Sequence, residues 1–108
     1  MNMNLQEFVT LTRDEQKDYT FRNRIVCNDG FSMSVQGSEG LYCQPRENSP
    51  IFTKMEIGFP SEQEDLIMEF AETPENPTDT VYGYVPVEII QKVIDKHKGI
   101  NLDKTFEK

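Results

Sequence analysis

Nine carboxylates lie between Met55 and Gln91, a stretch that contains no Lys or Arg. This stretch accounts for the whole net charge of −8, because the remaining residues carry ten acids against eleven bases. Carboxylates grouped in this way repel nucleic acid and attract basic partners, and such binding weakens as salt is added. The nine residues are Glu56, Glu62, Glu64, Asp65, Glu69, Glu72, Glu75, Asp79 and Glu88.

The separation of these acids from Lys favours a surface that binds a partner. Acids that only keep a small domain in solution are usually mixed with bases, although a purely solubilising surface also fits this composition. The candidate partner-binding residues are Glu62, Glu64, Asp65, Glu69 and Glu72.

A second polar group surrounds a predicted hairpin and the loop that follows it. Its serines and glutamine alternate along one strand and therefore share the face that looks away from the core. Arg46, between Pro45 and Glu47, has the fork of donors that binds phosphate or carboxylate. Turn chemistry and a solvated strand face explain the same residues without a ligand. The candidate ligand-binding residues are Asn28, Asp29, Ser32, Ser34, Gln36, Tyr42 and Arg46.

No pattern in the chain specifies a reaction. The run Gly30–Ser34 lacks the second glycine of a nucleophile elbow, and the only histidine, His97, is expected on the apolar side of a helix as a core or capping residue. Cys27 and Cys43 show no metal-binding spacing, so we expect buried, reduced thiols. The sequence favours a non-enzymatic protein without a metal or a cofactor.

Length and composition predict one domain with a modest core. The chain has 108 residues, of which 36% are hydrophobic, and seven Phe and four Tyr must serve as bulky core residues because Trp is absent. The apolar runs are too short for a transmembrane helix, and the first residues lack the pattern of a signal peptide. We therefore expect a cytoplasmic protein.

Three helical regions are predicted from capping patterns and apolar spacing. The boxes Asn4–Glu7 and Thr12–Glu15 predict one or two short helices in an N-terminal segment, residues 1–20. The box Ser61–Glu64 predicts a helix that continues to about Glu72. A longer helix should begin near Pro86, stop at Gly99 and pack an apolar stripe across a sheet.

Several short strands are predicted between these helices. The Asp29–Gly30 step indicates a hairpin, and its second strand should direct Phe31, Met33 and Val35 to the core. The expected fold class is α+β, with a small antiparallel sheet of about four to five strands in a core that spans residues 21–100. Residues 101–108 are expected to form a flexible tail. The expected strands cover residues 21–27, 31–36, 41–43, 52–59 and 80–85, and an exposed edge at 52–59 would allow a homodimer by strand addition.

Four segments, within roughly residues 26–100, resemble small accessory proteins carried by bacteriophages and prophages. The resemblance implies a protein that acts in the cytoplasm of a bacterial host cell. The segments are residues 27–36 (CNDGFSMSVQ), 42–46 (YC and PR around Gln44), 56–61 (EIGFPS) and 81–86 (VYGYVP).

Three functions fit these observations. The favoured one is a non-enzymatic acidic phage protein that binds and inhibits a basic, nucleic-acid-handling host or defence protein, as anti-CRISPR and other anti-defence proteins do. It would contact neither nucleic acid nor membrane directly. The alternatives are a small-ligand module that binds or sequesters a nucleotide or similar anion, and a phage structural or morphogenesis component.

Overall fold

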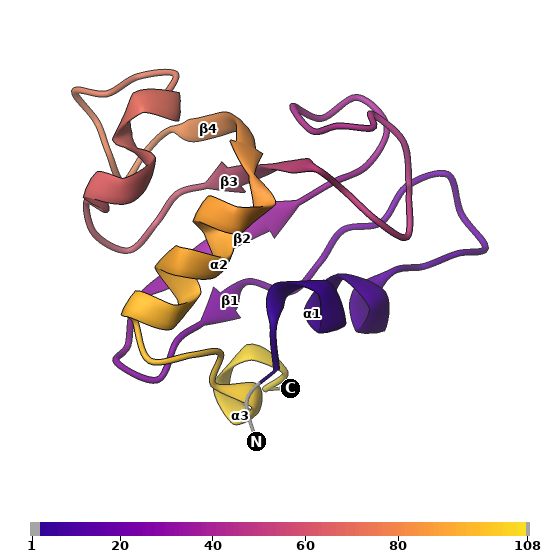
Figure 1. Ribbon diagram of the computed structural model, residues 1–108, viewed down its shortest axis with the longest axis horizontal. Coiled ribbons are helices and arrows are strands. Elements are labelled where there is room, and N and C mark those ends of the chain that lie inside the picture. Colours follow the sequence, from indigo (N-terminus) through magenta and orange to yellow (C-terminus); the bar gives the residue numbers. More distant parts are fainter. Residues whose placement is uncertain (1–2, 108) are drawn as a thin grey trace.

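The computed structural model describes residues 3–107. Its centre is a four-stranded antiparallel sheet with the order β1-β2-β3-β4 (Figure 1). Each strand pairs with the next along the chain, which confirms the predicted antiparallel sheet and the α+β class. The strands are β1 (Ile25–Val26), β2 (Ser32–Gln36), β3 (Lys54–Gly58) and β4 (Val81–Pro86).

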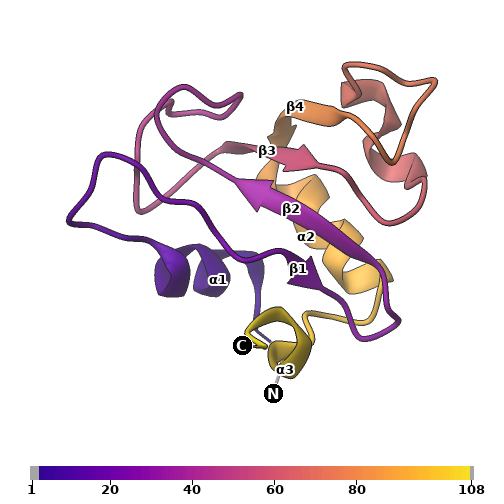
Figure 2. The same ribbon diagram turned by 180° about the vertical axis from the view of Figure 1, so that it is seen from behind.

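Helices cover one face of this sheet. The helix α2 (Val87–Lys96) lies behind β2 and β3 in Figure 2 and buries its apolar stripe in the same core as the inward residues of the strands. α1 (Leu5–Thr12) packs beside α2, and α3 (Leu102–Thr105) lies against β1. The opposite face, which we call the outer face, carries the alternate residues of β2 and β3, among them Ser34 and Glu56.

The predicted hairpin is confirmed. Ile25 lies opposite Met33, and Gly30 adopts a φ of +97°, a left-handed value that glycine accepts without steric cost. Asp29 closes the turn by accepting a hydrogen bond from the backbone N–H of Phe31 at 3.0 Å. Phe31, Met33 and Val35 are buried, as the alternation predicts.

Two of the three predicted capping boxes do not begin a helix. The Asn4–Glu7 box caps α1, but α1 ends at Thr12, where the hydroxyl donates back to the carbonyl of Phe8 at 2.7 Å. After Pro60, Glu64 itself accepts from the backbone N–H of Leu66, and the short 3₁₀ helix η1 (Asp65–Phe70) follows. Glu64 is the N-cap of η1 because its carboxylate accepts from the free N–H of Leu66 in the first turn.

Three other expectations are wrong. Leu41–Cys43 forms no strand, since its backbone makes only scattered bonds such as that from Tyr84 N–H to the carbonyl of Tyr42. β3 lies between β2 and β4, so the segment 52–59 offers no edge for strand addition. The region expected to be a tail contains α3, whose Thr105 is buried and bonds the backbone of Val26; Lys108 lies outside the described residues.

One buried imidazole joins three distant segments. His97 lies at the end of α2. Its Nδ1 is 2.7 Å from a carboxylate oxygen of Asp29, and its Nε2 is 2.7 Å from a carboxylate oxygen of Glu64. Its ring stacks on Phe31 with centroids 4.0 Å apart, and Lys96 also reaches Glu64 at 3.0 Å. We call this cluster the His97 clamp. It ties the hairpin turn and the start of η1 to α2.

The charges in the clamp stabilise one another. Burial alone would lower the pKa of His97, but the hydrogen bonds to the carboxylates of Glu64 and Asp29 outweigh it and raise the pKa. Burial would likewise raise the pKa of Glu64, yet the N–H of Leu66, His97 and Lys96 together lower it. A carboxylate on each ring nitrogen thus favours the protonated imidazolium form of His97.

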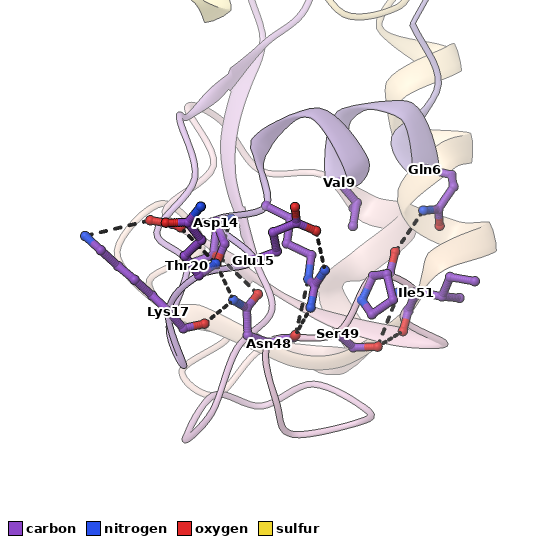
Figure 3. A network of polar contacts seen from close by, with 12 residues as sticks. Gln6, Val9, Asp14, Glu15, Lys17, Thr20, Asn48, Ser49 and Ile51 are labelled. Carbon is purple, nitrogen blue, oxygen red and sulfur yellow. Dashed lines mark hydrogen bonds and ion pairs between the residues drawn. The ribbon is translucent and has the colours of Figure 1, made fainter.

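The long loops are fixed by one amide side chain. Asn48 donates to the carbonyls of Asp14 and Lys17, both at 2.8 Å, and accepts from the hydroxyl of Thr20 at 3.0 Å (Figure 3). Arg13 adds bonds to the Asn48 carbonyl. The segment after α1 is thereby attached to the loop that precedes β3. Within residues 3–107, the helices are all too short and too polar to cross a lipid bilayer.

The clamp predicts how stability depends on pH. The raised pKa of His97 gives stability that is complete below its ordinary value of 6.5 and is lost as pH rises through the folded value. The lowered pKa of Glu64 gives stability that is present above 4.5 and is lost as pH falls. Urea unfolding across this range should give the largest free energy between these two values.

The variant His97→Gln provides the control. It removes the imidazolium and should flatten the alkaline decline while lowering stability by about 3 kcal/mol, the typical cost of leaving a buried ion without its partner. An unchanged alkaline decline in this variant would show that another group titrates there.

Candidate protein-interaction surface

Residues 61–79, which contain η1 and the connection to β4, form what we call the acidic lobe. Figure 1 shows this segment at one end of the molecule, away from α1 and α3. Six of its carboxylates are exposed, and none of the six forms an ion pair within residues 3–107. They are Glu62, Asp65, Glu69, Glu72, Glu75 and Asp79.

Glu64, predicted to bind a partner, is part of the interior instead. Its side chain is 1% exposed and both oxygens are engaged, one by His97 and the other by Lys96 and the N–H of Leu66. Its carboxylate is unavailable to a partner because it completes the His97 clamp. The other four predicted residues, Glu62, Asp65, Glu69 and Glu72, are exposed as expected.

A groove with aromatic walls adjoins the acidic lobe. It has a volume of about 310 Å³ and is lined by Tyr42, Phe70, Glu72, Gly83 and Tyr84. We call it the tyrosine groove. The rings of Tyr42 and Tyr84 lie 5.9 Å apart between centroids, and Glu72 brings a carboxylate of the lobe to the same groove. Aromatic contact area therefore lies beside uncompensated negative charge.

The two tyrosines are fixed by the backbone around them. The N–H of Tyr84 donates to the carbonyl of Tyr42 at 2.9 Å, and the N–H of Tyr42 donates to the carboxylate of Glu56 at 3.0 Å. A Cβ on Gly83 would lie 3.2 Å from the Cβ of Tyr42, closer than most side chains tolerate. Gly83 thus lets the segment around Tyr42 approach β4.

A bulge directs Tyr84 outward. Met55 pairs with Val85 and Ile57 with Tyr82, so Gly83 and Tyr84 together lie opposite the single residue Glu56. Tyr84 adopts a left-handed φ of +54° and leaves 40% of its surface exposed. A bulky residue in this conformation costs about 1 kcal/mol, so the surrounding structure must stabilise it.

The structure does not bring the seven predicted ligand-binding residues into one pocket. Asn28 bonds the carbonyl of Lys98, and Asp29 belongs to the His97 clamp. The Ser32 hydroxyl accepts from Arg24, and Arg46 donates to the carbonyl of Leu41. The internal bonds of these four residues serve the fold.

The remaining three predicted residues are divided between two grooves. Tyr42 lines the tyrosine groove, whereas Ser34 and Gln36 line a separate groove on the outer face. Gln36 is buried, and its amide is satisfied there: it accepts from the N–H of Arg22 at 2.8 Å and donates to the carbonyl of the same residue at 2.9 Å. The Gln36 side chain therefore makes the two hydrogen bonds with the backbone of Arg22 that a neighbouring strand would otherwise make.

Sequence reasoning missed the half-buried Phe70 and the exposed Tyr84 as residues of the groove, because both belong to apolar runs that predict burial. The sequence feature that could have revealed the exposure of Tyr84 is Gly83, because a glycine inside a predicted strand often marks a bulge. A bulge shifts the alternation by one residue, and Tyr84 then faces solvent rather than the core.

The histidine and both cysteines are engaged or buried. Both ring nitrogens of His97 contact carboxylates, so the ring has no free nitrogen to act as a base. Cys27 and Cys43 are free, buried thiols as predicted, and burial raises the pKa of Cys27 to about 11, which keeps it protonated. Across the described chain, no cluster of three His, Cys, Asp or Glu side chains is arranged to hold a metal ion.

Comparisons with protein-family models, curated proteins and solved structures found no match to this chain. The resemblance to phage accessory proteins therefore stays a prediction from the sequence.

Two neighbouring glutamates should respond differently to the same substitution. Glu64→Gln removes the buried charge that faces His97 and should lower the free energy of unfolding by about 3 kcal/mol. Glu62→Gln, two residues earlier and exposed, should change it by less than about 0.5 kcal/mol. Chemical denaturation of both variants tests the division of the acidic residues into interior and surface groups, and equal effects would contradict it.

Proposed function

We propose that this chain is a non-enzymatic interaction protein that binds a basic, nucleic-acid-handling protein and blocks its nucleic-acid surface. The observation that carries the proposal is the combination of six exposed carboxylates, which form no ion pair with any residue of the described range 3–107, and the adjoining tyrosine groove. The acids supply charge complementarity and the aromatic rings supply contact area.

The two parts have different roles in binding. Exposed carboxylates attract a basic surface from a distance and raise the association rate, but each rim charge adds little affinity. Buried aromatic side chains near the centre of an interface usually carry most of the affinity. Tyr42 and Tyr84 are suited to that position because their backbone is fixed before a partner arrives, which lowers the entropy lost on binding.

The class of partner follows from the sign of the charge. A surface that binds nucleic acid presents Lys and Arg to phosphates, and a lobe of unpaired carboxylates competes for the same groups. The proposed setting, a bacterial cytoplasm in which a phage protein of anti-CRISPR or other anti-defence type inhibits host machinery, rests on the sequence resemblance.

Charge reversal in the lobe tests this proposal. The triple variant Glu62→Lys, Asp65→Lys, Glu69→Lys should reduce capture of the partner from bacterial lysate by about tenfold or more, because like charges then face each other. Quantitative mass spectrometry of proteins eluted by a salt gradient measures the loss. The captured protein should be basic, and its purified form should lose nucleic-acid binding when the wild-type chain is added.

A matched control changes the same net charge elsewhere. Asp18→Lys, Glu39→Lys and Glu47→Lys reverse three exposed acids outside the lobe and should leave capture unchanged. If both triple variants lose the partner equally, net charge rather than the lobe is responsible. If neither variant loses it, the acidic-lobe mechanism is wrong.

The tyrosine groove gives an independent prediction. Tyr84→Gly removes the ring and relaxes the left-handed backbone, so the free energy of unfolding should change by less than about 1 kcal/mol. Affinity for the purified partner should fall about 30-fold, as expected of a hot-spot residue, while its salt dependence stays the same. Unchanged affinity in a calorimetric titration would remove the groove from the interface.

A further inference from the structure

A second groove, the outer-face groove, lies between residues 19–24 and the strands β2 and β3. It has a volume of about 350 Å³, which lies within the range of small-molecule sites. The bottom of the groove is formed by Ser34, Gly58 and Val81, which lie side by side on three adjacent strands. Their side chains are small or absent, which leaves space above the sheet. A Cβ on Gly58 would meet only ordinary contacts, 3.6 Å from the Cβ of Ser34.

Three exposed aromatic rings line this groove. Phe21 is 75% exposed, and Tyr19 and Phe59 are each 48% exposed. Phe59 has a left-handed φ of +49°, so the backbone carries strain where the ring leaves the end of β3. The strain is not relieved by burial of the ring, which suggests a role for the exposed aromatic face.

Tyr19 and Phe21 are held in place because their neighbours, Thr20 and Arg22, form hydrogen bonds toward the interior. The N–H of Thr20 donates to the Ser38 hydroxyl at 2.8 Å. The Thr20 hydroxyl donates to the side-chain oxygen of Asn48 (Figure 3). The backbone of Arg22 pairs with the amide of Gln36. Thr20 and Arg22 are thereby buried, and Tyr19 and Phe21 stay exposed beside them.

One exposed guanidinium at this groove, that of Arg24, lacks an acidic partner among the described residues. Within residues 3–107, neither Arg22 nor Arg24 forms an ion pair, although the chain carries nineteen acids. Arg24 uses Nε and one terminal nitrogen on Ser32 and Phe59, and its Nη1 donates to none of the described residues. The guanidinium of Arg22 is directed into the interior instead, where it donates to the carbonyls of Gly37 and Val9 and lies 5.8 Å from the centroid of the Phe52 ring; its Nε has no partner among residues 3–107. The lining carboxylate, Glu56, is engaged by the N–H of Tyr42.

We propose that the outer-face groove binds a nucleoside monophosphate, with its base stacked on the exposed rings and its phosphate on Arg24. Stacking on aromatic side chains accepts any base, and a guanidinium is the preferred partner of a phosphate. A single phosphate suits one free Nη1, whereas a polynucleotide would also meet the acidic lobe. The site is independent of the protein interaction proposed above.

Calorimetric titration with AMP and UMP tests the site, with adenosine and inorganic phosphate as partial ligands. The wild-type chain should bind both nucleotides at submillimolar concentration and adenosine more weakly. Phe21→Ala should weaken nucleotide binding about fivefold or more through lost stacking. Gly58→Leu, which fills the floor, should abolish it, and Ile51→Ala, which removes an exposed apolar side chain outside the groove, should leave it unchanged.

Three results would overturn the proposal. They are absence of nucleotide binding by the wild-type chain, equal binding by wild type and Gly58→Leu with both chains folded, and binding of a short oligothymidylate in preference to UMP. Because the acidic-lobe reversal leaves this groove intact, that triple variant should still bind AMP, and the two proposals can therefore fail separately.

Discussion

The His97 clamp is the interaction on which the functional surface depends. Three segments that are far apart in the sequence, the hairpin turn at Asp29, the N-cap of η1 at Glu64 and the end of α2, meet on one imidazole. A buried charge without partners is costly, so each of these groups is stable there only while the others are present. The acidic lobe begins at the residues around Glu64, and this contact fixes its position relative to the sheet together with the bonds that join Ala71, Glu72 and Pro77 to β4. A small core of modest apolar content gains from such a cluster, because it specifies one arrangement of segments that hydrophobic packing alone would fix less uniquely.

The two faces of the sheet have different roles, since one packs the core and the other carries the proposed binding grooves. The inner face is apolar and packs against α1 and α2, whereas the outer face lies uncovered by them and carries both aromatic grooves. Tyr84 and Phe59 adopt left-handed backbone conformations and still expose their rings. Strain of this kind persists only where the surrounding bonds enforce it, and here it presents aromatic surface to solvent. Charge is divided in a similar way: among residues 3–107, the exposed acids of the lobe form no ion pair, and neither does Arg24 at the outer-face groove.

The fold class was predictable because its signals are local. Strand alternation, the Asp29–Gly30 turn and the apolar stripe of α2 each identify an element without knowledge of the others. The capping boxes at Thr12 and Ser61 were misleading, since the same side chains found other partners in the folded chain. Glu64 shows why the site was only partly predictable: its sequence neighbours make it look exposed, and only the approach of His97, thirty-three residues later, makes it interior. Likewise, the exposure of Tyr84 depends on a bulge that one glycine only hints at.

The protonation state of His97 can be read directly from long-range ¹⁵N–¹H NMR of its ring. At neutral pH the account predicts that both Nδ1 and Nε2 carry protons, with downfield proton resonances from the short contacts to Asp29 and Glu64. On raising the pH past the elevated pKa of His97, amide exchange should accelerate first in residues 61–79. A neutral ring with one bare nitrogen at pH 7, or an acidic lobe whose amide protection does not follow the titration, would contradict the claim that this imidazolium positions the lobe.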